Sequence, residues 1–389
     1  MKKIIALAIS AAFVTPAAFA DVELGPFSIY GAAATAVEII SVENNTGKPL
    51  VSTKDSQTRL MDQTSKLGFK AKYDLGNDFF ALAQVESRFY LGNNSDATDN
   101  KAEIGSRNTF VGVGGKQVGT LRLGRYDNAY KLSLKQIVPT LYGNMNDASA
   151  TYGSGQILNR LGARQTDVMA YESPEIAGFS GNLSYNFGKD STAGKEDLTP
   201  QVALGVAYKN KLVNVGFGYT TVDNAAWDLT KSSKSNAKNL NTTTAGAAQG
   251  TQKLNAWQLG AQFNYMDFSA GAVFERTSSS YTGLKAGNFD QTQNVFGLIG
   301  GYKKDALEVQ VQYAKANEVD GAVGTTGSGT GGQQASVAVG YQFHKYVQAV
   351  ASFTKVHNQS KSTFTSASGF TLDAGNGMNQ FALGLVGKF

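Results

Sequence analysis

Sixteen segments of alternating apolar and polar residues, joined by connections that alternate strictly between short and long, are the feature that most constrains this fold. The long connections are rich in Gly, Asn, Ser and Thr. Sixteen antiparallel strands need seven turns at one end and eight loops at the other, and this chain offers that number of each. Short turns at one end and longer loops at the other indicate an outer-membrane barrel. A β-sandwich gives no reason for connection length to be sorted by end. The expected strands are 26–42, 64–74, 79–90, 105–114, 118–126, 165–173, 179–188, 200–210, 211–222, 253–266, 267–277, 291–303, 304–316, 332–343, 344–357 and 378–389.

The two faces of the expected strands differ in polarity. After residue 20, no stretch approaches the roughly 20 consecutive apolar residues that a spanning helix needs. In 66–73, however, Lys66, Lys70 and Lys72 alternate with apolar residues. Such a strand cannot be buried on both faces, so the lysine face is expected to meet water in a lumen and the other face to meet lipid. A solvated edge of a sandwich is the alternative interpretation.

The first 20 residues have the pattern of a signal peptide. Lys2 and Lys3 precede an apolar run over 4–14, and Ala18-Phe19-Ala20 forms a cleavage site. We therefore expect an exported chain with one domain, a barrel over 21–389. The absence of Cys excludes a disulfide framework and a thiolate metal site, and the presence of only two His argues against a His-rich metal centre, so no metal or other cofactor is expected. The net charge of +5 gives no argument for nucleic acid.

The number of strands is itself informative about function. Barrels of about sixteen to eighteen strands leave an aqueous channel unless something fills them. The connection 127–164 is far longer than most loops without a function. It contains apolar residues, including Tyr130, Leu134 and Ile137, that a fully solvated loop would waste. We expect an all-β, 16-stranded antiparallel transmembrane barrel in which this third loop folds inward and constricts the channel.

Five segments, in order along the chain, resemble landmarks of the general porins of β-proteobacteria and Neisseria. They are SKLGFKAKYDLGNDFFALAQVESRF at 65–89, RNTFVGVGG at 107–115, GTLRLGRYD at 119–127, YESPEIAGFSGNLSY at 171–185 and GLVGKF at 384–389. The resemblance to this family implies a homotrimer in the Gram-negative cell outer membrane, each barrel having its own diffusion pore. It also implies that the barrel-assembly machinery recognises Phe389. The expected surroundings are outer-membrane lipid and lipopolysaccharide.

The same resemblance implies a cluster of basic residues on the wall that faces the third loop. Three candidates come from matched positions, and strand parity adds Arg88; together they are Lys66, Arg88, Arg107 and Arg164. Lys70 and Arg122 share the lumen parity and are further candidates. The expected acids on the loop are Asp127 and Asp147. Fixed charges across a narrow gap select ions, so a basic wall facing few acids predicts mild anion selectivity.

The sequence therefore favours a passive, non-enzymatic channel for small hydrophilic solutes and ions. A channel selective for sugars or organic anions is the alternative, and it would need aromatic side chains along the lumen, where Phe80 has the required parity. A barrel enzyme would need a His, Ser or Asp constellation at the loop face. His357 is the only histidine near a long loop, and no partner for it is evident. An adhesin role for the long loops is compatible with each of these.

Overall fold

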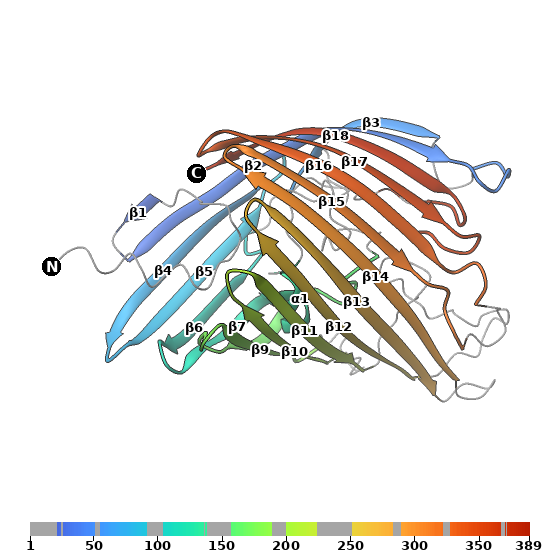
Figure 1. Ribbon diagram of the computed structural model, residues 1–389. Helices are drawn as coiled ribbons and strands as arrows, with labels where there is room; N and C mark the ends of the chain where they lie inside the picture. The colour runs from blue at the N-terminus through green and yellow to red at the C-terminus, as the bar shows by residue number, and fades with distance from the viewer. Residues whose placement is uncertain are drawn as a thin grey trace.

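The strands close into a single antiparallel barrel (Figure 1). The computed structural model describes residues 22–24, 26–50, 55–91, 104–135, 137, 157–188, 200–223, 251–282, 289–321, 327–366, 370 and 372–389. Among these residues no helix is long and apolar enough to cross a membrane. The predicted signal peptide lies outside the described residues.

The described residues contain eighteen strands and one short helix, α1 (Ala129–Leu134). The strands are β1 (Val22–Leu24), β2 (Phe27–Glu43), β3 (Ser56–Asp62), β4 (Lys66–Gly76), β5 (Phe79–Arg88), β6 (Thr109–Gly115), β7 (Gly119–Asp127), β8 (Arg164–Glu172), β9 (Phe179–Asn186), β10 (Gln201–Lys209), β11 (Val213–Val222), β12 (Thr251–Tyr265), β13 (Phe268–Thr282), β14 (Phe289–Lys304), β15 (Leu307–Ala316), β16 (Gly332–His344), β17 (Val347–Asn358) and β18 (Gly377–Lys388).

The eighteen strands occupy sixteen positions around the barrel, because two of these positions are each filled by two strands placed end to end. β3 and β4 share one edge of β2, where β3 pairs with residues 35–41 and β4 with residues 27–32. On the other edge of β2, β18 pairs with residues 32–43, and β1 continues the same edge by pairing with residues 27–29. Gly31 and Phe389 exchange two backbone hydrogen bonds, of 2.7 and 3.1 Å, where the ends of the chain meet. The prediction of a sixteen-stranded antiparallel barrel is confirmed.

One expected loop contains a strand. The sequence predicts a long connection over 43–63, but β3 occupies its second half. A break between β3 and β4 hides this strand, since Thr64 has a φ of 66° there. The Asp62 carboxylate accepts hydrogen bonds from the backbone N–H groups of Thr64 and Ser65, at 3.1 and 3.2 Å, and so stabilises the break.

The outer face of the barrel is apolar and the inner face is polar. Along β18, Leu383 and Leu385 are 55% and 57% exposed, whereas Ala382 and Val386 on the opposite face are buried. The inner faces of β12–β18 carry many buried Gln, Ser and Thr side chains, such as Gln258. A continuous exposed apolar surface of this extent suits lipid and not water. The predicted assignment of the lysine face of 66–73 to the interior agrees with this pattern, since Phe69 and Tyr73 are half exposed on the outside.

A charge on the outer face should therefore be costly. We expect Leu383→Arg, near the middle of β18, to lower the free energy of unfolding by about 2–4 kcal/mol, because the guanidinium would lie in hydrocarbon. Urea unfolding of the protein in lipid vesicles measures this, with Leu383→Phe as the matched apolar control. A loss equal to that of the control would show that this face does not meet lipid.

Candidate functional site

The connection after β7 turns into the barrel and begins with α1. Asn128 is the N-cap, its side-chain oxygen accepting a hydrogen bond of 2.9 Å from the Lys131 N–H. The Asn128 N–H donates to the carbonyl of Ala163, at 2.8 Å, which joins the start of the connection to its end. The helix packs on the inner faces of β9, β10 and β11. From β9, the Ser184 hydroxyl accepts a hydrogen bond of 2.9 Å from the Ala129 N–H.

Glycines on the wall let the helix lie directly on the sheet. A Cβ at Gly205 of β10 would be 2.7 Å from the Ala129 carbonyl oxygen, and one at Gly216 of β11 would collide with the Ser133 carbonyl. From β12, the Gln258 amide donates to the Tyr130 carbonyl at 2.6 Å. The wall is therefore shaped to receive the backbone of this helix.

The returning part of the same connection is held by β13 and β14. The Asn159 N–H donates to a Glu275 carboxylate oxygen at 2.6 Å, and Arg160 Nη2 donates to Gln293 Oε1 at 2.7 Å. Arg160 Nε also lies 3.8 Å from Glu275 Oε1, with both side chains fully buried. The described parts of the connection thus lie against β9–β14, as the predicted inward fold requires. The sequence analysis missed this anchor, although Glu275 has the inward parity in β13.

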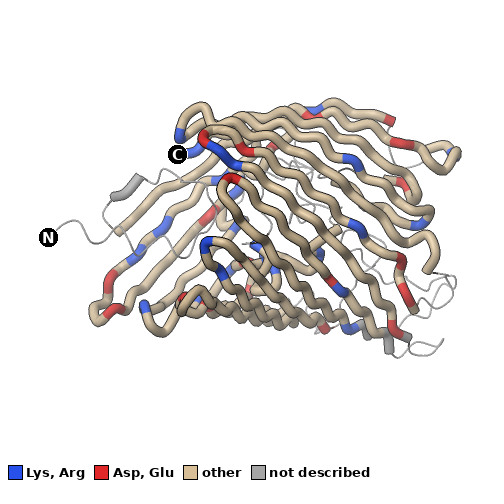
Figure 2. The backbone as a smooth tube through the Cα atoms, viewed as in Figure 1, with Lys and Arg blue, Asp and Glu red and all other residues tan. Residues whose placement is uncertain are grey.

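The wall made by β2–β6 carries the predicted bases around the Glu86 carboxylate. Arg107 Nε lies 2.5 Å from Glu86 Oε1, and Lys66 Nζ lies 3.5 Å from Glu86 Oε2. The Tyr30 hydroxyl donates to Oε2 at 2.9 Å. The Lys70 ammonium lies 3.8 Å from the centroid of the Tyr30 ring, in a cation–π arrangement. In Figure 2, several positive segments follow one another along β4, and a negative segment lies on the neighbouring β5.

Two more ion pairs continue this wall. Arg88, the cross-strand partner of Lys66, has its Nε 3.5 Å from Asp62 Oδ2. Arg59 Nη2 lies 2.8 Å from Glu38 Oε2. All four side chains are largely buried, so each guanidinium has a carboxylate to offset the cost of leaving bulk water.

A second group of bases surrounds Asp127 at the root of the inward connection. Arg164 Nε is 3.2 Å, Lys131 Nζ 2.7 Å and Lys135 Nζ 3.9 Å from a carboxylate oxygen of Asp127. Asn108 joins two members of the group, because its amide donates to Asp127 at 3.3 Å and its carbonyl accepts from Arg164 Nε at 2.6 Å. Both the wall and the helix therefore contribute positive charge here.

We call these ion-paired side chains the basic network: seven bases (Arg59, Lys66, Arg88, Arg107, Lys131, Lys135 and Arg164) and four acids (Glu38, Asp62, Glu86 and Asp127). Among the described residues, and with Lys131 protonated, it holds three positive charges in excess. The sequence analysis placed four of the bases on this wall but counted only Asp127 and Asp147 as facing acids. Asp147 lies outside the described residues.

Arg122 and Arg164 reach their places in different ways. Arg122 points inward but lies apart from the network, with Nη1 2.8 Å from Glu172 Oε2 and its guanidinium over the Phe110 ring. Arg164 was assigned to the basic wall by its matched position, and it shares its strand parity with Val168. A register shift between Arg164 and Val168 breaks the inward and outward alternation of side chains along β8, and Asp167 has a φ of 58° there. Arg164 is therefore brought to Asp127 beyond a bulge, which parity alone does not anticipate.

Lys131 lies in α1, outside the spanning strands, and its pKa departs from the usual value of a lysine. Burial lowers the pKa of Lys131 to about 7, although the neighbouring Asp127 carboxylate favours the charged form. The Lys131 ammonium is therefore charged below pH 7 and is progressively neutralised above it. No group of three potential metal ligands from His, Cys, Asp or Glu occurs within the described residues.

The chain is similar to a set of known proteins. The family model described as Gram-negative porin matches residues 6–361. The major outer membrane protein P.IB of Neisseria meningitidis serogroup B is 34% identical over 220 residues, which are 56% of this chain and 58% of that protein, so the match spans little more than half of that relative. The P.IB protein of Neisseria sicca is 27% identical over 364 residues, 90% of this chain and 92% of that one.

Solved structures share the fold. An anion-selective porin from Comamonas acidovorans has a TM-score of 0.68 at 20% identity, covering 93% of this chain and 99% of that chain. OmpT, an outer membrane protein of Vibrio cholerae, has a TM-score of 0.66 at 15% identity, covering 95% of this chain and all of its own. At these identities the likeness concerns the arrangement of the strands.

The close packing of α1 against Gly216 can be tested by adding a side chain at this position. We expect Gly216→Val to destabilise the protein by about 1–3 kcal/mol, because the added side chain collides with the helix backbone. Displacement of the helix should also change the single-channel conductance in planar bilayers. Phe217→Val, on the outer face of the same strand, is the matched control and should leave conductance unchanged. Equal conductance in both variants would mean that α1 does not set the width of the lumen.

The Lys131 titration predicts a pH dependence. Because the ammonium loses its proton as the pH rises through about 7, any preference of the lumen for anions should be larger at pH 6 than at pH 8. Zero-current potentials in a salt gradient measure the preference. Lys131→Met should remove most of the change between these two pH values. A variant that titrates like the unmodified protein would contradict the assignment to Lys131.

Proposed function

The chain belongs to the Gram-negative porin family, and we propose that it is a passive diffusion channel for small hydrophilic solutes and ions with a mild preference for anions. Its place is the cell outer membrane. The observation that carries the proposal is the basic network, whose seven bases outnumber its four acids on the wall of β2–β6 and at the root of the inward connection. The Comamonas acidovorans structure, described as anion-selective, has the same fold.

The magnitudes favour a modest effect. Two unit charges about 4 Å apart interact by roughly 1 kcal/mol in bulk water and by roughly 4 kcal/mol at an effective dielectric constant near 20. Each acid of the network cancels much of the field of its own base, so only the excess charge acts on a passing ion. A difference of about 1.4 kcal/mol between anion and cation would correspond to a tenfold preference. We therefore expect a preference of a few fold and not strict selectivity.

The partners follow from the same proposal. We infer a homotrimer, and one of the similar Vibrio cholerae OmpT structures is a trimer form. Outer-membrane lipid with lipopolysaccharide should surround the apolar outer face. The barrel-assembly machinery should recognise Phe389, a residue that is 41% exposed. Members of this family are channels and not enzymes.

A channel for organic anions is the second candidate. Lys70 lies over the Tyr30 ring and Lys72 over the Phe80 ring, with ammonium-to-centroid distances of 3.8 and 4.0 Å. These two pairs follow one another along the inner face of β4 and combine positive charge with an aromatic surface. Saturable block of ion current by low concentrations of an organic anion would favour this candidate over general diffusion.

Charge reversal tests the main proposal. In planar bilayers with a salt gradient, the unmodified protein should give zero-current potentials that show a mild anion preference. Arg107→Glu and Arg164→Glu should each shift the preference toward cations by roughly fivefold, for about 1 kcal/mol of change. Lys116→Glu is the matched control, because this exposed lysine lies in the turn between β6 and β7. Strong cation preference in the unmodified protein, or vesicles that remain sealed to ions, would refute the proposal.

A further inference from the structure

The outer surface of β15–β18 changes abruptly from apolar to polar near the long-loop end of the barrel. On β17, the outward and exposed Phe353 is followed at the same parity by Lys355 and His357. On β15, Tyr313 is followed by Lys315 in the same way. Below this level the outward side chains are apolar, including Phe381 on β18. The boundary between hydrocarbon and headgroups is therefore expected to cross the sheet here.

The polar residues above this boundary lie next to each other. We call Lys315, Gln333, Lys355, His357 and Asn379 the rim patch. Gln333 pairs with Lys315 on one side and with His357 on the other, which puts these two bases about 10 Å apart, two strand spacings. Asn379 is the cross-strand partner of Lys355.

Hydrogen bonds order part of the rim patch. The Lys355 ammonium and the Asn379 amide both contact Glu43 Oε1, at 2.6 and 3.0 Å. The Tyr313 hydroxyl donates to Gln333 Oε1 at 2.9 Å, and this leaves the amide nitrogen of Gln333 directed elsewhere. The patch therefore presents two lysines, a histidine and amide groups, and the Glu43 carboxylate pairs with Lys355 and Asn379 at one side of it.

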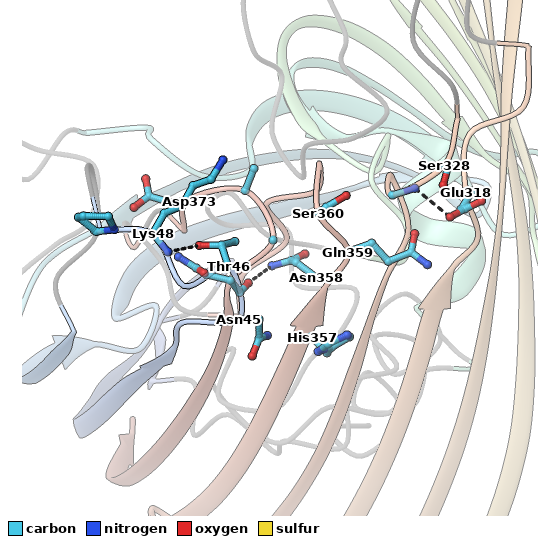
Figure 3. A pocket seen from close by; sticks show the side chains of 15 residues that line it. Asn45, Thr46, Lys48, Glu318, Ser328, His357, Asn358, Gln359, Ser360 and Asp373 are labelled. Carbon is cyan, nitrogen blue, oxygen red and sulfur yellow. Dashed lines mark hydrogen bonds between the residues drawn. The ribbon is translucent and has the colours of Figure 1, made fainter.

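A polar hollow lies directly beyond the rim patch. It has a volume of about 820 Å³ and is formed by the ends of three long loops. His357 belongs to both the patch and the hollow, and Asn45 lies beside it (Figure 3). Amide and hydroxyl groups from Thr46, Gln359 and Ser360 line the hollow together with Lys48. This volume is within the range of roughly 300–1,000 Å³ that is usual for small-molecule sites.

We propose that the rim patch and the hollow bind a phosphorylated glycolipid of the outer leaflet. Acyl chains would lie on the apolar face of β15–β18, a phosphate would lie between Lys315, Lys355 and His357, and sugar hydroxyls would enter the hollow. Lysine and histidine give charge-assisted hydrogen bonds to phosphate oxygens, and amide groups match hydroxyls. The proposal rests on the outer-membrane location given above, and it assigns the lipopolysaccharide contact to named residues.

The outer surface of β9, β10 and β11 has no counterpart of the rim patch. Across β9, β10 and β11 the only lysine or arginine is Lys209, at the short-turn end of β10. The outward residues toward the loop end of these strands include Leu183, Val202 and Tyr219. A general need to mark the membrane boundary with positive charge would have placed such residues there as well.

Binding of defined lipids tests the proposal. Purified full-length protein is incubated with bisphosphorylated lipid A, dephosphorylated lipid A or phosphatidylglycerol, and retained lipid is counted by native mass spectrometry. We expect bisphosphorylated lipid A to bind best. The double variant Lys315→Gln with Lys355→Gln should bind it roughly tenfold more weakly, because two cations near the headgroup are lost. Lys253→Gln, an outward lysine on β12, is the matched control and should bind as the unmodified protein does.

Two lipid-binding results would overturn the proposal. Equal retention of phosphatidylglycerol and lipid A would overturn the role of the hollow, and equal binding by the double variant would overturn the role of the rim patch. The conductance and zero-current potential of the double variant should equal those of the unmodified protein, because these side chains face away from the lumen. An altered potential would count against the outward placement, and a sealed unmodified protein would refute the channel function separately.

Discussion

Closure of the sheet is the constraint on which every other feature depends. In hydrocarbon, a backbone N–H or C=O without a partner costs several kcal/mol, so a sheet can cross a membrane only if it has no free edge. β2 supplies the closure, since β18 and β1 pair with one of its edges and β3 and β4 with the other. Once the backbone is satisfied in this way, the side chains need only differ between the two faces.

The charges of the inner wall follow a second constraint, the cost of burial. Glu86 serves both Lys66 and Arg107, and Asp127 serves three bases. A partly buried base without a nearby acid would be destabilising, so the acids make the cluster possible. The positive excess that passing ions meet is therefore the remainder of a largely neutral framework, which limits how strongly such a wall can discriminate.

The sequence was sufficient for the strands, their faces and the inward connection, because alternation and connection length are local properties. It did not reveal β3, since the positive φ of Thr64 separates this strand from β4. Nor did it reveal which acid neutralises which base: Glu86 and Arg107 are 21 residues apart and meet only through the register of β5 with its neighbour. The same holds for Glu275 and Asn159, 116 residues apart. Gly205 and Gly216 carry no signal until the helix that packs on them is known.

The inward connection is attached to the wall at two separated places, through α1 on β9–β11 and through Asn159 and Arg160 on β13–β14. Its two described parts therefore brace neighbouring strands of the wall from the inside. Contacts of this kind resist flattening of that part of the cylinder under lateral pressure from the bilayer. A substitution that loosens them would therefore change the rigidity of the barrel as well as the position of the connection.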